Sequence, residues 1–574
     1  MVDLSRVPHN LRRFVVEQDY AEYTEIDQAV WRFVLLQTYE RLARTAHPAY
    51  AQGLGRAGIS VERIPHIEEM SACLERFGWS AVCVDGFIAP RAFQEFQAAS
   101  ILPIAADMRT KEHLVYTPAP DIIHEAAGHA PILPDVRYAA YLREIGEVGK
   151  KAFSSPEDAR VYAAIFELSE VKETPGVSAA AITAAETRLS RALDQVTETS
   201  EASRISRLYW WTAEYGLVGT PRDYKLYGAG LLSSLWESHA CHDITVKKLA
   251  LGADCVEQAY DITRTQPQLY VARDFEHLFA VLHEVEAKLV HRTGGDAALQ
   301  AAVKSEEVAT LRLPHDGFAV GEVASVQGGS RRGVVTLRGR VGLGVADAAF
   351  EIFEAPSEGY RVPIGPLTDG ALLSSLTESE LRARAKGRRL HLGFAGGVEL
   401  SGNLARTIPN ARGGTALVEL EDYELRSSSG TGFCERGARR WLCAADEVLT
   451  AHAGSANPEF FPESTPSSVR VPKPRTFAER ERALLALYDR AIAAFRGHAG
   501  SGVVSGFLPI VADLDREFSE EWLLRWNLLE CLVKLGEQGP LAVSLETALA
   551  RLEVRFSHRE PIATGLRYLS SLAA

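Results

Sequence analysis

Several features that would place a protein in a particular class are missing from this chain of 574 residues. Its seven cysteines are few, odd in number and without CxxC spacing, which argues against a disulfide framework or a zinc ribbon. No stretch of about 18 consecutive apolar residues occurs, and the N-terminus lacks the apolar segment of a signal peptide. We therefore expect neither secretion nor insertion into a membrane, and we expect a cytoplasmic location.

An excess of positive charge is missing as well. The formal net charge is −13, so the sequence provides no basic surface that would attract nucleic acid or an acidic membrane. With 46% hydrophobic and 24% charged residues, the composition is that of a globular protein. The length suggests about two to four domains. The expected partner is a small molecule, and nucleic acid is not expected.

The pattern of apolar residues changes along the chain. Up to residue 305 it is mainly helical, since apolar residues recur at three- and four-residue steps in segments such as 26–43 and 275–290. From 306 to 455, glycine-rich turns separate short alternating runs such as 334–341, which is typical of β-hairpins. We expect a first domain over 1–305 and a β-rich domain of unknown role over 306–455.

Three further segments differ from their surroundings in composition. Residues 456–475 are rich in proline and predict a linker, and the periodicity of 476–574 predicts a helical C-terminal segment. A helix expected over 477–495 either joins two copies in a homo-oligomer or packs on its own domain, and the second is the simpler explanation. Residues 172–200, rich in Ala, Glu and Thr, are expected to form an exposed helical insertion.

The stretch YTPAPDIIHEAAGHAPIL, residues 116–133, is the most informative part of the chain. It places His124 and His129 five residues apart, beside the acids Asp121 and Glu125. Neutral imidazole is the commonest metal ligand in proteins, so the pair points to a metal site. Two histidines at one spacing are weak evidence alone, and two unrelated polar residues explain them equally well.

The spacing of the histidines excludes a zinc peptidase of the H-E-x-x-H type, because that motif needs its second histidine four residues on, where this chain has Gly128. It also makes metal-dependent hydrolysis with Glu125 as the general base a poor alternative. Five residues apart on an undistorted α-helix, two rings point about 140° apart. The helix must therefore end, widen or bulge near Gly128 if both histidines bind one ion.

A third ligand is expected in LYWWTAEYGLV, residues 208–218, where Glu214 lies in an aromatic, apolar stretch. A carboxylate in such surroundings is costly unless it binds a cation or a base, although a partly exposed surface acid on a helix remains the alternative. Two histidines and one carboxylate form the facial arrangement used by oxygen-activating Fe(II), which leaves three coordination positions open.

YTPAPDIIHEAAGH, LYWWTAEYGLV and LYGAGLLSS (226–234) resemble, in this order, three signature blocks of the pterin-dependent aromatic amino acid hydroxylases, and most closely those of phenylalanine hydroxylases. The resemblance extends from about residue 7 to residue 289. It implies a mainly α catalytic domain of the aromatic amino acid hydroxylase type, followed here by the β-rich domain and the C-terminal helical segment. It also implies that His124, His129 and Glu214 are the iron ligands.

The resemblance further implies Fe(II) and a tetrahydropterin as cofactors, O2 as co-substrate, and hydroxylation of the ring of a free aromatic amino acid. Phe93 is implied to stack on the pterin, with Ile88, Glu125 and Tyr209 nearby. Arg109 is implied to bind the substrate carboxylate, for which its planar guanidinium is suited. The other implied substrate-binding residues are Thr117, Pro120, Trp210, Ser233, Tyr260 and Ile262.

The chain departs from the family pattern in several ways. His129 and Glu214 lie 85 residues apart, several tens more than usual, and 172–200 is the expected insertion, looped out on the surface. Tyr215 stands where the family usually has phenylalanine. No regulatory domain is expected ahead of the catalytic block. Gly228 and Gly230 are expected in tight backbone at the pocket wall rather than in a phosphate-binding loop.

The sequence leaves more than one possibility open for the substrate and for the role of the protein. Trp210 is typical of phenylalanine hydroxylases, whereas Ile262 is more like tryptophan hydroxylases. We rank phenylalanine to tyrosine first, tryptophan second and tyrosine third, with the ring position hydroxylated left open. The competing hypothesis is a catalytically silent scaffold that acts through its C-terminal half, against which the intact ligand set argues.

Overall fold

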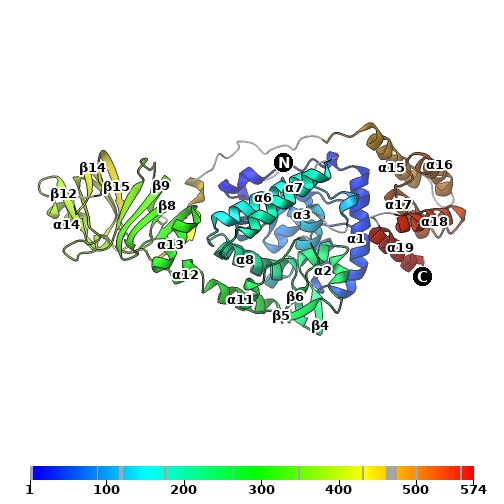
Figure 1. Ribbon diagram of the computed structural model, residues 1–574, viewed down its shortest axis with the longest axis horizontal. Coiled ribbons are helices and arrows are strands. Elements are labelled where there is room, and N and C mark those ends of the chain that lie inside the picture. Colours follow the sequence, from blue (N-terminus) through cyan, green and yellow to red (C-terminus); the bar gives the residue numbers. More distant parts are fainter. Residues whose placement is uncertain are drawn as a thin grey trace.

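The computed structural model describes residues 4–86, 88–114, 120–173, 177–262, 264–346, 349–429, 432–460, 475–497, 502–555 and 559–573. Figure 1 shows its elements in three groups along the longest axis. Helices and short strands lie in the middle, longer strands gather at one end, and helices gather at the other end, where the C-terminus lies. None of the helices in these ranges is both long enough and apolar enough to cross a membrane.

The middle group contains sheets as well as helices. Its elements are α1 (Glu25–Thr45), α2 (Ala49–Arg56), α3 (Ile67–Leu74), β1 (Ser80–Val84), α4 (Pro90–Ala98), β2 (Ile101–Ala105), α5 (Val136–Gly149), α8 (Glu201–Tyr209), β3 (Leu217–Thr220), β4 (Asp223–Leu226), α9 (Ala229–Ser233), α10 (Glu237–Ala240), β5 (Lys247–Ala250), β6 (Gln268–Ala272) and α11 (Phe275–Glu286). Strands β1 and β2 pair in parallel, and a second sheet has the order β4-β3-β6-β5. The expectation of a mainly helical first region is therefore confirmed only in part, because strands of four or five residues are too short to show a clear alternation.

Helix α1 lies at the edge of the middle group, beside the C-terminal helices (Figure 1), and begins at a capping box. The Thr24 hydroxyl accepts the N–H of Asp27, and the Asp27 carboxylate accepts the N–H of Thr24. The helix buries Trp31 and Phe33 completely. It contacts α2 and α9 of the middle group and also packs against the C-terminal helical group, so it links two of the three groups.

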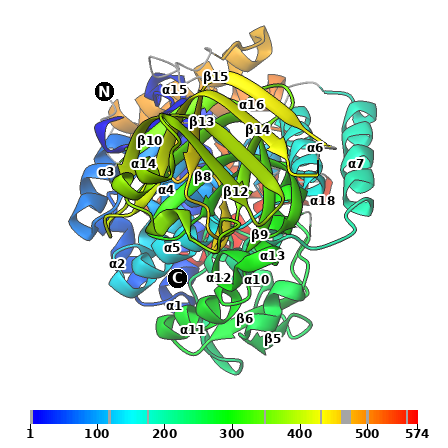
Figure 2. The same ribbon diagram turned by 90° about the vertical axis from the view of Figure 1, so that its left-hand side faces the viewer.

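The insertion expected over 172–200 contains one arm of a helical hairpin. Helix α6 (Pro156–Glu173) and helix α7 (Ala179–Asp194) pack on each other through a small apolar cluster that includes Leu168 and Leu189. Most other side chains of α7 are exposed, and Figure 2 shows α7 at the edge of the molecule.

The β-rich group contains two antiparallel sheets. Its strands are β7 (Val308–Arg312), β8 (Gly317–Gly329), β9 (Arg332–Val345), β10 (Ala349–Glu354), β11 (Tyr360–Ile364), β12 (Arg389–Phe394), β13 (Val398–Pro409), β14 (Thr415–Ser427), β15 (Cys434–Cys443) and β16 (Thr450–Ala453). One sheet has the order β10-β9-β8-β7-β16, with β11 also paired to β9, and the other has the order β12-β13-β14-β15. Helix α13 (Gly295–Ser305) packs against β8 and β16, so this group begins before the first strand.

The C-terminal group contains α15 (Glu479–Gly497), α16 (Gly502–Glu517), α17 (Leu523–Lys534), α18 (Pro540–Arg555) and α19 (Arg559–Ala573). It shares one hydrophobic core with the middle group. Phe33 of α1 lies edge-on to Trp522 and Trp526, with ring centroids 5.1 and 4.7 Å apart. Leu487 and Tyr488 of α15 are buried within the same chain. The structure thus gives no support to self-association through this helix, and the domain bounds at 305, 455 and 475 stay predictions.

Because α1 and α17 share a core, we expect Trp526→Ala to lower the free energy of unfolding by about 3–5 kcal/mol, the usual loss for a fully buried large aromatic side chain. Trp526 is 0% exposed, whereas Leu535, just beyond α17, is 40% exposed. Leu535→Ala is the matched control, with an expected change within about 0.5 kcal/mol. Urea unfolding followed by circular dichroism measures both, and equal losses in the two variants would contradict the shared core.

Candidate metal centre

The two histidines lie on a π-helical turn, η6 (Ile123–His129). Hydrogen bonding from residue i to residue i+5 widens a helix, so residues five apart come to lie about one turn apart. The widening that the sequence required near Gly128 is therefore present. Gly128 also fits closely against α9, since a Cβ atom there would lie 2.6 Å from the carbonyl oxygen of Ala229.

Glu214 ends a second π-helical turn, η8 (Trp210–Glu214), which continues directly from α8. The chain entering α9 packs tightly on the end of this turn. A Cβ atom on Gly228 would lie 2.4 Å from the carbonyl oxygen of Glu214, and one on Gly230 would lie 2.9 Å from the ring of Tyr215. The two glycines thus occupy tight backbone, as expected from the sequence.

The two π-helical turns bring three side chains together. Nε2 of His124 lies 3.2 Å from Oε2 of Glu214, and Nε2 of His129 lies 3.0 Å from Oε1 of Glu214. The histidine rings are 5.1 Å apart and nearly perpendicular, at 87°. One potential ligand atom from each residue lies within 4.8 Å of the others, and within the described ranges this is the one group of that kind.

The protonation of these side chains suits a bound cation. His129 is buried, and its Nδ1 has no hydrogen-bond partner among the described residues, while its Nε2 faces Oε1 of Glu214 at 3.0 Å. Nδ1 of His124 lies 3.1 Å from the hydroxyl of Ser233, which itself donates to the carbonyl of Ala229. The hydroxyl oxygen therefore accepts Nδ1–H, which leaves Nε2, on the side of Glu214, as the nitrogen available to a metal.

Burial and charge act in opposite directions on the titration of this group. Burial alone would raise the pKa of Glu214, but the adjacent His129 and His124 lower that pKa well below its usual range. Burial alone would lower the pKa of His124, but the Glu214 carboxylate raises it to about 9. Burial raises the pKa of Glu125, whose Oε2 lies 3.8 Å from Nε2 of His129. The pocket favours a positive charge next to Glu214, which a divalent cation would supply.

Arg109 and Asp121 form a buried pair beside the histidines. The guanidinium donates from Nε and Nη2 to the two carboxylate oxygens, each at 2.7 Å, and the Arg109 N–H donates to Oδ2 at 3.0 Å. Oδ1 of Asp121 also accepts the N–H of His124 at 3.0 Å. Asp121 thus connects the arginine to the histidine turn, a role that sequence reasoning missed although the residue lies three positions before His124.

Two of the residues assigned to the pterin, Phe93 and Tyr209, lie beside His129. The ring of Phe93, on α4, is 6.3 Å from the ring of His129 and 5.7 Å from that of Tyr209. The Tyr209 hydroxyl accepts a hydrogen bond of 2.6 Å from Gln97, also on α4. Ile88 is buried in the apolar cluster beneath α4. Helix α4 therefore determines where the Phe93 ring lies.

The contacts of the residues assigned to the substrate are described only in part. Trp210 is stacked between Tyr215 and Tyr260, at centroid distances of 4.6 and 4.2 Å, so the tyrosine that replaces the usual phenylalanine is part of this stack. Pro120 and Ile262 are half-buried. Thr117 lies outside the described residues, and Ser233 contacts His124.

Comparison with known proteins relates the part of the chain that contains these residues to a protein family. Residues 14–179 and 191–293 match the family model of the biopterin-dependent aromatic amino acid hydroxylases. The chain is thus similar to this family over these two segments. The phenylalanine-4-hydroxylase of Pseudomonas aeruginosa is 27% identical over 277 residues, covering 48% of this chain and 88% of that protein. The enzyme of the same name from Ralstonia nicotianae is 29% identical over 269 residues, covering 46% and 72%.

A crystal structure of Chromobacterium violaceum phenylalanine hydroxylase with bound iron(III) and 7,8-dihydrobiopterin is 24% identical and covers 50% of this chain and 92% of that one, with a TM-score of 0.38. The family assignment confirms the enzyme class expected from the three sequence blocks, a pterin-dependent aromatic amino acid monooxygenase. The unmatched residues 180–190 fall within α7.

Gly128 provides a test of the η6 turn. We expect Gly128→Ala to lower the free energy of unfolding by about 1–3 kcal/mol, because the added methyl forces η6 away from α9. Iron affinity should fall as well, since His124 and Ser233 separate. Gly55→Ala in α2 is the control, because a Cβ atom there meets nothing within 4 Å. Thermal unfolding and iron content measure both effects, and equal behaviour of the two variants would contradict the close fit.

Proposed function

We propose that this chain hydroxylates the ring of a free aromatic amino acid with Fe(II), a tetrahydropterin and O2, and that its main reaction converts phenylalanine to tyrosine. The convergence of His124, His129 and Glu214, the last two of them buried, carries this proposal. Two histidines and one carboxylate leave adjacent coordination positions open. The cytoplasmic location expected from the sequence belongs to the same proposal.

In this proposal, Nε2 of His124, Nε2 of His129 and the carboxylate of Glu214 bind the iron. Fe(II) and the tetrahydropterin together supply the reducing power that activates O2 for ring hydroxylation. Ser233 keeps the proton of His124 on Nδ1, so that Nε2 stays available as a ligand. The two π-helical turns bury His129 and Glu214 and leave His124 half-buried, which limits the access of bulk water to the ligands.

The pterin would lie beside Phe93, which offers a flat apolar surface for a flat heterocycle. The Tyr209 ring, edge-on to Phe93, forms one wall of this space. Glu125 is buried near His129, and its Oε2 has no hydrogen-bond partner among the described residues. This oxygen is therefore available to accept an N–H of the pterin. Each of these side chains acts by binding and orienting the ring.

The amino acid would be oriented by its carboxylate. Arg109 has five N–H donors, of which the Nε and one Nη2 hydrogen point at Asp121. The remaining guanidinium hydrogens are available to a second carboxylate. Asp121 has a pKa below its usual range, because Arg109 outweighs the effect of burial, so the pair stays charged and in place. The substrate ring would then extend toward the iron ligands.

The choice of phenylalanine over tryptophan rests on Trp210, which is typical of phenylalanine hydroxylases and is held by stacking on Tyr215 and Tyr260. Tryptophan hydroxylation is the second candidate, and Ile262 is the residue that favours it. A catalytically silent scaffold is disfavoured, because the ligand group is intact and its side chains converge.

The test is anaerobic loading with Fe(II), followed by oxygen uptake and product analysis with tetrahydropterin and phenylalanine, tryptophan or tyrosine offered separately. We expect tyrosine from phenylalanine, formed only when pterin is present. Preferential formation of hydroxytryptophan would contradict the substrate assignment alone. An iron-loaded protein that forms no product from any of the three would contradict the proposed function.

A further inference from the structure

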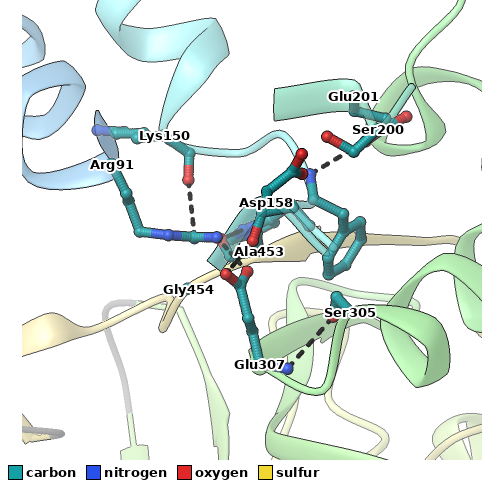
Figure 3. Close-up of polar contacts among 12 residues, drawn as sticks. Arg91, Lys150, Asp158, Ser200, Glu201, Ser305, Glu307, Ala453 and Gly454 are labelled. Atoms are coloured by element: carbon teal, nitrogen blue, oxygen red, sulfur yellow. Dashed lines mark hydrogen bonds and ion pairs between the residues drawn. The ribbon is translucent and has the colours of Figure 1, made fainter. Parts of the chain in front are cut away.

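The β-rich group is attached to the catalytic part next to the helix that carries Phe93. Figure 3 shows this junction. Phe153, which follows α5, lies in the hydrophobic core of the β-rich group with Leu299 and Leu311. The N–H of Ala453, in β16, donates to the carbonyl of Lys151 at 3.0 Å. The two parts are therefore joined by a shared core and by a backbone hydrogen bond, so the side-chain contacts described next lie at a well-packed junction.

Glu307 lies between α13 and β7 and reaches across the junction. Its carboxylate accepts from the guanidinium of Arg91 through one oxygen and from the hydroxyl of Ser154 through the other. The Glu307 N–H donates to the hydroxyl of Ser305 at 3.3 Å, which restrains its backbone. Both charged side chains are partly buried, with 26% and 32% of their surface exposed. A bridging pair of this kind is less screened than a surface pair.

Arg91 is in the first turn of α4, two residues before Phe93. Its Nη1 donates to the carbonyl of Lys150 at 3.3 Å, and Gly454 allows the β-rich group to approach the same guanidinium, since a Cβ atom there would lie 3.3 Å from Nη1. No side chain caps the N-terminus of α4. Arg91 therefore anchors this turn to Lys150 and Glu307, and the other end of the helix is anchored by the hydrogen bond from Gln97 to Tyr209.

We propose that Glu307 is a positioning residue for the pterin: through Arg91 it fixes the first turn of α4 and thereby the ring of Phe93. This inference rests on the proposed function and assigns part of the β-rich group to it. The link is remote in sequence, 216 residues from Arg91 to Glu307.

The test measures KM for tetrahydropterin, KM for phenylalanine and kcat in Glu307→Ala. We expect the pterin KM to rise roughly three- to tenfold, as for loss of a partly buried bridging pair, with little change in the phenylalanine KM. Arg91→Lys should give part of the same rise, because lysine keeps the charge but lacks the fork that reaches both Lys150 and Glu307. Glu198→Gln is the matched control, since Glu198 pairs with Lys304 at the same junction and both are exposed.

Combining Glu307→Ala with Phe93→Leu distinguishes positioning of the Phe93 ring from a purely structural role of Glu307. If Glu307 acts through the Phe93 ring, Glu307→Ala in a Phe93→Leu background should change the pterin KM by less than twofold, because the stacking ring to be positioned is gone. An unchanged pterin KM in folded Glu307→Ala, or equal effects of Glu307→Ala and Glu198→Gln, would overturn the inference. A wild-type protein without pterin-dependent turnover would instead overturn the proposed function on which it rests.

A separate observation concerns the C-terminal helices. Lys111, two residues after Arg109, donates from Nζ to the carboxylate of Glu521, just before α17. That carboxylate is almost fully buried and also accepts from the hydroxyl of Tyr488 at 2.9 Å and from the N–H of Leu524 at 3.2 Å. The buried acceptor is thus fixed within the C-terminal group, and the lysine comes from the loop that carries the substrate arginine.

We further infer that Lys111 is a positioning residue for the Arg109 loop, anchored by the C-terminal helices. Lys111→Met combined with Glu521→Gln removes both charges, and the glutamine oxygen still accepts from Tyr488. We expect the phenylalanine KM of this double variant to rise roughly three- to tenfold, with the pterin KM unchanged. This is the reverse of the pattern for Glu307→Ala, so each variant controls for the other. A phenylalanine KM within twofold of wild type, or a parallel rise in both KM values, would overturn the inference.

Discussion

Glu214→Gln is expected to lose bound iron and hydroxylation together. The glutamine keeps the size of the side chain but removes the negative charge that lies 3.2 and 3.0 Å from the two histidine nitrogens. A divalent cation would then be held by two neutral imidazoles alone, in a buried site where no other described carboxylate belongs to the ligand group. We expect turnover to fall by about 1,000-fold. This is the upper end of the loss seen when an enzyme loses a group that stabilises charge at its reaction centre.

The measurement is iron per chain after anaerobic loading and gel filtration, together with product formed per minute. Glu237→Gln is the matched control, because both carboxylates are 8% exposed and Glu237, on α10, lies outside the ligand group. The control should keep iron and activity. Treatment of the wild-type protein with a chelator should reproduce the Glu214→Gln result, and added Fe(II) should reverse it only in the wild type. Full activity in Glu214→Gln would show that the metal, or the reaction, lies elsewhere.

The candidate ligands could be predicted from the sequence because their chemistry is local. The five-residue spacing of His124 and His129 required a widened helix, and the η6 turn has that form. The carboxylate of Glu214 in an apolar stretch required a cation, and it lies against both histidines. In each case the residue type and its immediate neighbours determine the environment, so no knowledge of distant contacts was needed.

Asp121 shows where local reasoning ended. It was visible as an acid beside the histidines, but its role depends on Arg109, on a separate loop, which occupies both of its oxygens. The arrangement of the three groups was beyond prediction for the same reason. The links Arg91 to Glu307 and Lys111 to Glu521 join residues 216 and 410 positions apart, and neither pair carries a periodic pattern that would reveal its partner. The short strands of the middle group were missed because four or five residues give too little alternation to recognise.

The structure also suggests a role for the C-terminal half, which its composition alone did not indicate. Its β-rich group contacts the helix that carries Phe93, and its helical group contacts the loop that carries Arg109. The two additions thus contact the first part of the chain at the two places where we propose that the pterin and the amino acid bind. A chain in which these contacts set substrate and pterin affinities separately needs both additions folded and in place before it reaches full activity.

Substitution of Arg109 should affect the amino acid much more than the iron. Arg109→Lys retains a positive charge, but a lysine cannot both satisfy the two oxygens of Asp121 and offer further N–H groups to a substrate carboxylate. We expect kcat/KM for phenylalanine to fall roughly 30- to 1,000-fold, which corresponds to loss of a buried charge-assisted interaction of about 2–4 kcal/mol. Iron content should stay at the wild-type value. Arg41→Lys, at a partly buried arginine that donates to Leu235 and Ser238, is the control.

Asp121→Asn is expected to damage both substrate and iron binding, and this distinguishes it from Arg109→Lys. The amide has a single acceptor oxygen, so its NH2 group faces a donor of Arg109 in either orientation, and it also faces the N–H of His124 when it takes the place of Oδ1. Either orientation leaves a buried donor unpaired and shifts the η6 turn. Parallel measurement of phenylalanine KM and iron dissociation decides the point. If Asp121→Asn changed only the phenylalanine KM, the hydrogen bond from His124 to Asp121 would have no part in holding the metal ligand, and Asp121 would serve the arginine alone.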